Sequence, residues 1–413
     1  MSNTKLSQFV KTPLWDDAVH RSILDSLDSA AYDKVCGWTV GQLSRFVLDS
    51  SESQIKAVMA GLPSDAIAAA VKLMSNQELV SVGQKVFNPL PGSNIGAKGY
   101  LGARVQPNSP TDSPEDVMWQ VFDAWAYGVG DVMLGTNPVS GTVEGVGAVE
   151  ECLKDIVKTF AVEQYLPWVV LSHIDVQNQV EKAHPGSTAL FFQSIAGTES
   201  ANQVFDVSVP KMTEYAKQRQ GRFGLYLETG QGADFTNGQA HGVDMGTLEA
   251  RKYGLARALK KDLGPNSWML VNDVAGFIGP EVFRTKDQLV RVALEDTVMG
   301  KLHGLTIGLD ICATLHMPIS LAELDQAQDE ILKANPAYLM ALPTKMDPML
   351  SYATTGVLDH GMYTRLVSEL GRSLRGGAQH RQCSLADGRG VAAKFVASAR
   401  GEVRSRHSSE EVG

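Results

Sequence analysis

Residues 223–310 decide the fold, because three short apolar runs in this stretch, FGLYLE (223–228), WMLVND (268–273) and GLTIGLD (304–310), are separated by longer segments of helical character. Continuous apolar runs of this length are typical of strands that are buried on both faces of a parallel sheet. The alternation of such strands with helices predicts repeated βα units.

Further apolar runs extend this alternation over residues 99–370. They are GARVQ (102–106), DVMLGTN (131–137), WVVLSH (168–173), ALFFQS (189–194) and AYLMALP (337–343). Helix-start patterns lie between the runs, in SPED (113–116), TKDQ (285–288) and SLAE (320–323). The shortest interval leaves room for one helix, IDVQNQVEKA (174–183). Eight strands with crossover helices predict an α/β fold, the (β/α)8 TIM barrel.

The segments on either side of the barrel have a different composition. Residues 1–98 predict a small helical region, with capping patterns at TVGQ (39–42) and SNQE (75–78) and strong helix formers in DAIAAAVKLM (65–74). Prolines and glycines in 88–99 mark its end. Residues 371–413 contain eight Lys or Arg and four Asp or Glu without an apolar stripe. We therefore expect a basic, poorly ordered tail.

Composition restricts the classes of function. The chain has 413 residues and a net charge of −9, which argues against nucleic acid as a partner. No apolar stretch approaches the length of a membrane span. The four cysteines are scattered without a CxxC pair, which favours a reducing, cytoplasmic environment.

The carboxyl ends of the strands carry the chemistry of a parallel barrel, so the polar residues that end each run are the site candidates. In chain order they are Arg104, Gln106, Asn137, Ser172, His173, Gln193, Ser194, Glu228, Asn272, Asp273 and Asp310. Glu228 and Asp310 can accept hydrogen bonds from an ammonium group, while Arg104 and the carboxamides can donate to an oxygen. This set predicts a small, polar, cationic substrate with a hydroxyl group. The alternative is a buried polar network that only closes the barrel.

Other chemistries have weaker support. No lysine ends a strand, so a Schiff-base mechanism has no candidate amine. Asp310, Cys312 and His316 form D-x-C-x3-H, which could ligate a metal. The favoured interpretation is that Asp310 is a functional carboxylate, Cys312 a buried thiol and His316 a loop histidine. Two alternatives remain: a metal-dependent barrel hydrolase that uses Glu228, Asp310 and His316, and a catalytically impaired barrel that acts as an assembly scaffold.

Eight strings in this order resemble the large subunit of ethanolamine ammonia-lyase. They are ARVQPN (103–108), GVGDVMLGTNPV (128–139), FFQSIAGTE (191–199), LYLETGQG (225–232), EARKYGLAR (249–257), VAGFIGPE (274–281), LEDTVMGKLHG (294–304) and MLSYATT (349–355). The similarity runs from about Trp38 to about Leu370. The family's N-terminal region is longer, and its Pro-Glu-Phe type segment after the barrel has no counterpart here.

The resemblance implies a barrel that binds adenosylcobalamin and converts ethanolamine into acetaldehyde and ammonia. It assigns substrate binding to Arg104, Gln106, Asn137, Glu228 and Asp310, and cobalamin contacts to Pro138, Gln193, Thr236 and Met349. It places Asp310 and Gln106 at the amine, Arg104 and Asn137 at the oxygen, and Glu228 between them. The cofactor-derived radical would then remove hydrogen from the carbinol carbon.

The resemblance also implies partners and a location. A small subunit completes the cofactor pocket, the subunits form a hetero-oligomer, and the large subunit alone is not expected to be active. The enzyme would be cytoplasmic or enclosed in a bacterial microcompartment. No protein histidine is implicated as a cobalt ligand, because the string D-x-H-x-x-G is absent, and no separate metal ion is expected.

Overall fold

The computed structural model describes residues 2–276, 283–314 and 316–373. The predicted basic tail therefore lies outside the described residues from 374 onward. No helix in the described ranges is long and apolar enough to cross a membrane.

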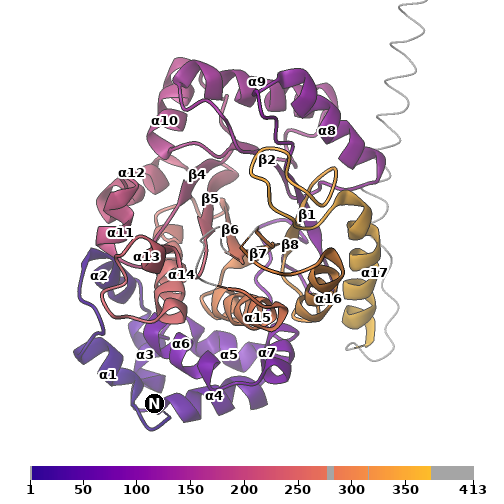
Figure 1. Cartoon of the computed structure of the whole chain (residues 1–413). Coiled ribbons are helices and arrows are strands. Elements are labelled where there is room, and N and C mark those ends of the chain that lie inside the picture. The colour runs from indigo at the N-terminus through magenta and orange to yellow at the C-terminus, as the bar shows by residue number, and fades with distance from the viewer. Residues whose placement is uncertain (1, 277–282, 315, 374–413) are drawn as a thin grey trace, which may run out of the picture.

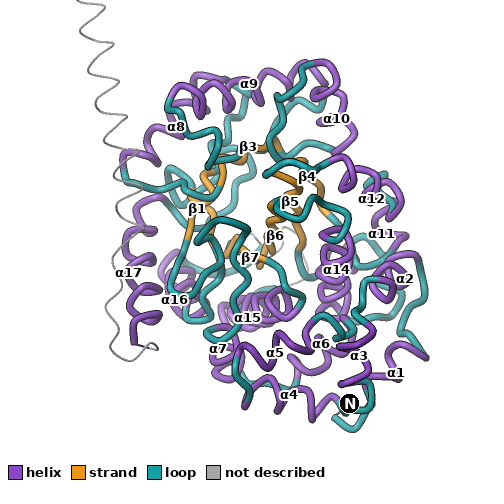
Figure 2. Tube along the Cα trace, turned by 180° about the vertical axis from the view of Figure 1, so that it is seen from behind, coloured by secondary structure: helices purple, strands orange, loops and turns teal. Residues whose placement is uncertain are grey.

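Eight parallel strands form the centre of the molecule, in the order β3-β2-β1-β8-β7-β6-β5-β4. Their bounds are β1 Gly102–Val105, β2 Met133–Thr136, β3 Trp168–Val170, β4 Phe191–Ser194, β5 Phe223–Thr229, β6 Trp268–Ala275, β7 Thr306–Ile311 and β8 Tyr338–Ala341. The first and last strands pair directly, with Arg104 opposite Met340. At the seam between β3 and β4, Leu190 N donates to Trp168 O at 3.2 Å. Figures 1 and 2 show the resulting ring of strands, and all eight predicted strands are confirmed.

Helices surround this ring and connect its strands. They are α8 Pro114–Ala126, α9 Val143–Thr159, α10 Ile174–Ala183, α11 Glu199–Val204, α12 Val209–Gln218, α13 Ala233–Thr236, α14 Met245–Lys260, α15 Lys286–Leu302, α16 Leu321–Leu332 and α17 Val357–Ser373. The predicted starts are confirmed, because Ser113, Thr285 and Ser320 are the N-caps of α8, α15 and α16. The short interval before β4 holds α10 over the predicted residues.

Strand alternation separates an inner from an outer core. Residues that face the barrel axis form one buried cluster that includes Met133, Phe192, Tyr226, Leu270, Tyr338 and Met340. Their neighbours along each strand pack against the surrounding helices. Gly135 makes room in this interior, because a Cβ there would lie 2.5 Å from Arg104 Nε. The inner layer can therefore contain a whole guanidinium group beside β2.

The predicted N-terminal helical region consists of seven helices. They are α1 Leu6–Lys11, α2 Ala18–Asp25, α3 Ser29–Val35, α4 Val40–Asp49, α5 Glu52–Met59, α6 Ser64–Lys72 and α7 Asn76–Gly83. The capping boxes predicted at Thr39 and Ser75 are both present. The helices α2 and α6 contact α14, and α7 contacts α15, so the region covers one side of the barrel (Figure 1). Most of its buried apolar side chains belong to the same cluster as residues of the outer core of the barrel.

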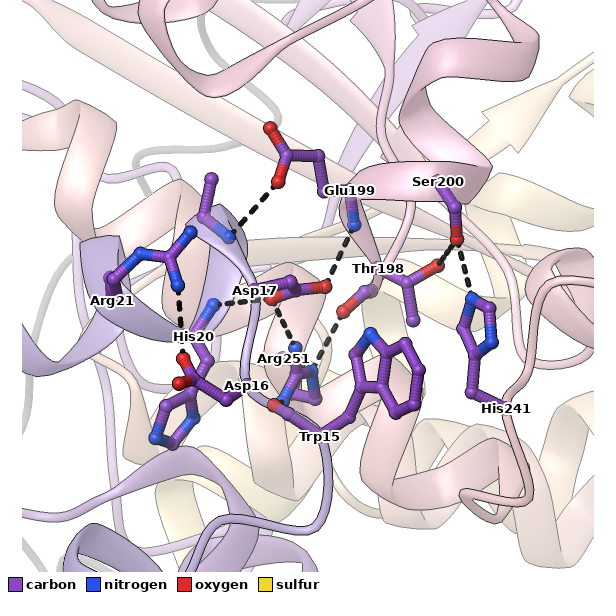
Figure 3. Close-up of polar contacts among 12 residues, drawn as sticks. Trp15, Asp16, Asp17, His20, Arg21, Thr198, Glu199, Ser200, His241 and Arg251 are labelled. Carbon is purple, nitrogen blue, oxygen red and sulfur yellow. Dashed lines mark hydrogen bonds and ion pairs between the residues drawn. The ribbon is translucent and has the colours of Figure 1, made fainter.

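A polar contact fastens this region to the segments that follow β4 and β5 (Figure 3). Asp17 Oδ1 accepts from Arg251 Nη2 at 2.7 Å, and Asp17 Oδ2 accepts from Glu199 N at 2.9 Å. Ala18 N in turn donates to Glu199 Oε2 at 3.2 Å, so α2 and α11 satisfy each other's first backbone N–H groups. The rings of Trp15 and His241 stack beside this contact, with centroids 4.0 Å apart.

Candidate active site

An ion pair lies inside the barrel at the carboxyl ends of β1 and β5. Arg104 Nη1 donates to Glu228 Oε1 at 3.0 Å and to Tyr226 Oη at 3.0 Å, while Tyr226 Oη is 2.7 Å from Glu228 Oε1. Arg104 is buried, and the Glu228 side chain retains 15% of its exposure. All three side chains have the same parity on their strands, which directs them to the barrel axis. Glu228 Oε2 receives no hydrogen bond from the described residues and is free to bind a ligand.

Asp310 is the second carboxylate of this site and lies at the end of β7. Tyr352 Oη donates to Asp310 Oδ2 at 2.8 Å, and the Thr354 hydroxyl donates to Asp310 Oδ1. Burial raises the pKa of Asp310 to about 6, and the hydrogen bonds from Thr354 and Tyr352 and the charge of Arg104 oppose that rise. Burial also raises the pKa of Tyr352 well above its ordinary value, so its hydroxyl remains a donor at neutral pH.

The two remaining substrate candidates belong to the same network. Gln106 Nε2 donates to Tyr352 Oη at 2.9 Å and to Asp347 Oδ2 at 2.8 Å. Asn108 Nδ2 donates to the same Asp347 oxygen at 2.7 Å and to Asn137 Oδ1 at 3.3 Å. Hydrogen bonds therefore connect Gln106, Asn137 and Asp310 through side chains of the loop after β8. The electrostatic influence of Arg104 and Glu228 on Asp310 links this network to the ion pair.

Several predicted strand-end residues face away from the barrel axis. His173 caps α10, where its ring accepts from Asp175 N at 3.2 Å. Gln193 Oε1 accepts from Ile174 N at 3.1 Å and so lies against the start of the same helix. Asp273 is placed with Asp296 between the barrel and its outer helices, and burial raises the pKa of Asp273 well above its ordinary value. Strand alternation explains this placement, because Asp273 has the opposite parity to its inward-facing neighbour Asn272.

Asn272 faces the axis in register with Glu228. It is fully buried, and neither atom of its carboxamide has a hydrogen-bond partner among the described residues. An unpaired buried amide is costly, so this group has unused capacity to bind a ligand.

Sequence reasoning missed five polar residues of the network: Tyr226, Asn108, Asp347, Tyr352 and Thr354. Two of them had a usable signal, since Tyr226 is two residues before Glu228 and Asn108 is two residues after Gln106, on either side of a strand end. The other three come from the loop after β8, whose strand run ends on Pro343 without a charge.

The cobalamin candidates all lie in or beside loops at the carboxyl ends of strands. Pro138 and Met349 are half-buried, Gln193 is buried and Thr236 is exposed at the end of α13. The same loops expose apolar side chains, namely Val139 at 55%, Phe235 at 59% and Met346 at 45%. Exposed apolar groups around a barrel mouth are typical of a face that a large ligand or a partner covers.

The metal alternative fits the geometry poorly. His316 Nδ1 is 2.6 Å from Thr314 Oγ1, and Cys312 is buried against Ala275 O, as the interpretation of a loop histidine and a buried thiol predicted. Glu228, Asp310 and His316 do not form a group of converging ligand atoms in the part of the chain that the structure describes. The group that does converge there is His173 with Asp175 and Asp206, and both of its carboxylates already pair with the Lys211 ammonium, at 2.8 and 3.2 Å.

The fold and these side chains define a (β/α)8-barrel protein with a polar, acceptor-rich site at the carboxyl ends of its strands. A family model described as "Ethanolamine ammonia lyase large subunit (EutB)" matches residues 1–375. The chain belongs to this ethanolamine ammonia-lyase large-subunit family. The match begins at residue 1, so family similarity reaches further toward the N-terminus than the resemblance at Trp38 suggested.

Named relatives agree with this assignment. The chain is 34% identical over 369 residues to the ethanolamine ammonia-lyase large subunit of Escherichia coli (strain K12), which covers 86% of this chain and 78% of the relative. It is 33% identical over 368 residues to the protein of that name from Salmonella typhimurium, with the same coverage. Among solved structures, a phospho-2-dehydro-3-deoxyheptonate aldolase from Thermotoga maritima overlaps 68% of this chain and 71% of its own at 13% identity and a TM-score of 0.42. That overlap is too weak to bear on the fold or the function.

Proposed function

We propose that this chain is the catalytic large subunit of an adenosylcobalamin-dependent ethanolamine ammonia-lyase, which converts ethanolamine into acetaldehyde and ammonia. The observation that carries the proposal is the meeting of Arg104, Glu228 and Asp310 in one buried polar network at the strand ends. Family membership supplies the reaction, and the network supplies the groups that this substrate needs.

The proposed substrate roles follow from the hydrogen-bonding capacity of each group. The ammonium end of ethanolamine carries only donors, which match the Asp310 carboxylate and the carboxamide oxygen of Gln106. The hydroxyl oxygen can accept from Arg104 and from the Asn137 amide. Glu228 Oε2, which accepts no hydrogen bond from the described residues, would bridge the amine and the hydroxyl. Holding both ends would fix the carbinol C–H bond in one orientation, which is the proximity contribution to catalysis.

The barrel mouth is suited to adenosylcobalamin. The exposed apolar side chains Val139, Phe235 and Met346 offer a broad face for a macrocycle. Pro138, Gln193, Thr236 and Met349 are the residues that we propose to hold it. When bound, the cofactor supplies an organic radical by homolysis of its cobalt–carbon bond. The residues of this chain would bind and orient the substrate and exclude water from the site.

The proposal extends to partners and location. A small subunit would complete the cofactor pocket, and the two subunits would assemble into a hetero-oligomer. We place the complex in the cytoplasm, where a bacterial microcompartment could enclose it.

Reconstitution tests the reaction. The chain, its small subunit and adenosylcobalamin should together release acetaldehyde from ethanolamine, measured by coupled reduction to ethanol. Glu228→Gln should lower kcat by about 100-fold or more while cobalamin still binds, because the substitution removes one charged partner of the substrate.

Glu150→Gln is the matched control, since Glu150 is buried behind the barrel, where it accepts from Thr188. It should keep wild-type turnover. Full activity of Glu228→Gln would refute the proposed mechanism.

The same preparation tests the two alternative functions. Stoichiometric zinc or manganese without retained cobalamin would favour the metal-dependent barrel hydrolase. Cobalamin binding without turnover by the wild type would favour the catalytically impaired barrel that acts as an assembly scaffold.

A further inference from the structure

The loop after β8, residues 342–356, folds back over the carboxyl end of the barrel. Ala353 and Ala313 exchange two backbone hydrogen bonds, at 2.8 and 2.9 Å, and Leu342 N donates to Thr355 O at 3.2 Å. The first two bonds fasten the loop to the segment after β7, and the third joins the two ends of the loop. They hold Asp347, which is 3% exposed, beside the proposed substrate residues.

The Asp347 carboxylate has a fixed orientation. Its Oδ1 accepts from Met349 N at 2.9 Å and from Leu350 N at 2.6 Å. Its Oδ2 accepts from Gln106 Nε2 at 2.8 Å and from Asn108 Nδ2 at 2.7 Å. An ionised carboxylate has acceptors and no donors, so both carboxamides must present their NH2 groups to it.

This contact determines the group that Gln106 can offer to a ligand. One Nε2 hydrogen goes to Asp347, and the other goes to Tyr352 Oη at 2.9 Å. The Tyr352 hydroxyl hydrogen goes in turn to Asp310. The side-chain oxygen of Gln106, Oε1, remains, and no described residue donates a hydrogen bond to it. Gln106 is thereby fixed as an acceptor beside a carboxylate.

The same carboxylate has the opposite effect on Asn137. Because Asn108 points its NH2 group at Asp347, its Oδ1 accepts from Asn137 N at 2.8 Å, and its Nδ2 also reaches Asn137 Oδ1 at 3.3 Å. This contact turns the side-chain oxygen of Asn137 toward Asn108. The NH2 group of Asn137 is the part that remains available as a donor.

We infer that Asp347 is a specificity-determining positioning residue that makes one end of the site an acceptor and the other a donor. It touches no substrate atom in this role and acts through Gln106 and Asn108. The inference rests on the proposed function, and it explains how the site distinguishes an amino alcohol from a diol. A diol of the same size has a hydroxyl where ethanolamine has an ammonium group with donors only.

Asp347→Asn tests the inference at nearly constant volume. The two backbone N–H groups need the oxygen of the introduced carboxamide, so its NH2 group would face Gln106 and Asn108, donor against donor. This repulsion between NH2 groups is relieved if the Gln106 amide turns over, which directs its NH2 group toward the substrate amine. In the complete complex we expect kcat/KM for ethanolamine to fall about 10- to 100-fold, chiefly through KM, because an acceptor for a charged group is lost. The inhibition constant of ethane-1,2-diol should remain within about threefold of its wild-type value, because that ligand has no ammonium group.

A second substitution should rescue the first. When Asp347→Asn is combined with Gln106→Glu, the introduced carboxamide can donate to one oxygen of the introduced carboxylate and leave the other oxygen as an acceptor. We expect most of the lost kcat/KM to return, which a purely structural defect would not allow. Asp359→Asn is the matched control, because Asp359 caps the same loop at Gly356 N without touching a proposed substrate residue. It should leave the preference for ethanolamine unchanged.

The outcomes separate the inference from the proposed function. A wild-type complex that neither binds nor converts ethanolamine would overturn both. A wild-type complex that converts ethanolamine, with an Asp347→Asn variant that keeps the wild-type preference or loses kcat alone, would overturn the inference and leave the function intact. If Asp347→Asn does not fold, as judged by circular dichroism, the double variant provides the test. Preference restored there supports the inference, and a folded double variant without restoration opposes it.

Discussion

At the scale of the residue, Asp310 is a group of the proposed substrate site whose charge changes near neutral pH. Burial raises its pKa from the ordinary 3.8 to about 6. Above that pH it is ionised and attracts the substrate ammonium, and below it the neutral acid does not. We therefore expect kcat/KM for ethanolamine to fall about tenfold per pH unit below about 6, measured from pH 5 to 8 in the assembled complex. The corresponding fall in kcat should lie at lower pH, because a bound ammonium group favours the ionised carboxylate.

Another buried carboxyl group provides the control for this pH profile. Burial raises the pKa of Glu150 to about 7, yet the residue lies behind the barrel wall beside Thr188. Glu150→Gln should keep the acid limb unchanged. If the acid limb shifted in Glu150→Gln, the titration would belong to Glu150 and not to Asp310.

At the scale of the element, α2 and α11 depend on one carboxylate at their shared N-termini. Asp17 accepts from His20 N in α2, from Glu199 N in α11 and from the fully buried Arg251 (Figure 3). Asp17→Asn keeps a good N-cap but leaves the Arg251 guanidinium without its charged partner. We expect the free energy of unfolding to fall by about 3–5 kcal/mol, measured by urea denaturation.

Asp16→Asn is the neighbouring control. The Asp16 side chain is 63% exposed and pairs with the exposed Arg21 at 3.1 Å. Exposed pairs contribute little, so this variant should lose less than about 1 kcal/mol. Equal losses in the two variants would contradict the role given to the buried pair.

At the scale of the whole molecule, the N-terminal helices and the barrel share one apolar cluster. We expect them to unfold together rather than as two units. Leu79→Ala removes a fully buried side chain of α7 and should cost about 2–5 kcal/mol. Amide hydrogen exchange in α6 and in β6 should accelerate together.

Leu73→Ala is the matched control, because Leu73 is 43% exposed at the end of α6. It should cost less than about 1 kcal/mol. Faster exchange in α6 alone, with β6 unchanged in Leu79→Ala, would show that residues 1–98 unfold independently. The boundary predicted at residue 98 would then also be a boundary of cooperative unfolding.

Local patterns were sufficient to predict the elements of this fold. All eight strands, the helix in the short interval before β4, and the capping boxes at Thr39 and Ser75 were predicted from neighbouring residues. These signals are local because hydrogen bonds in caps and side-chain alternation in strands act over only a few residues. The strand-end rule then selected Arg104, Glu228 and Asp310, which the fold brings together.

The sequence by itself determined the barrel, its helical N-terminal region and the family to which the chain belongs. Only the tertiary structure decided that Asn272 faces the axis while Asp273 faces the helices, and that Asp347 reaches Gln106 across 241 positions of sequence. Strand ends do not reveal which of two adjacent polar residues points inward, and loop composition does not reveal where a returning loop will lie. Those outcomes depend on strand register and on packing between distant segments, which no local pattern encodes.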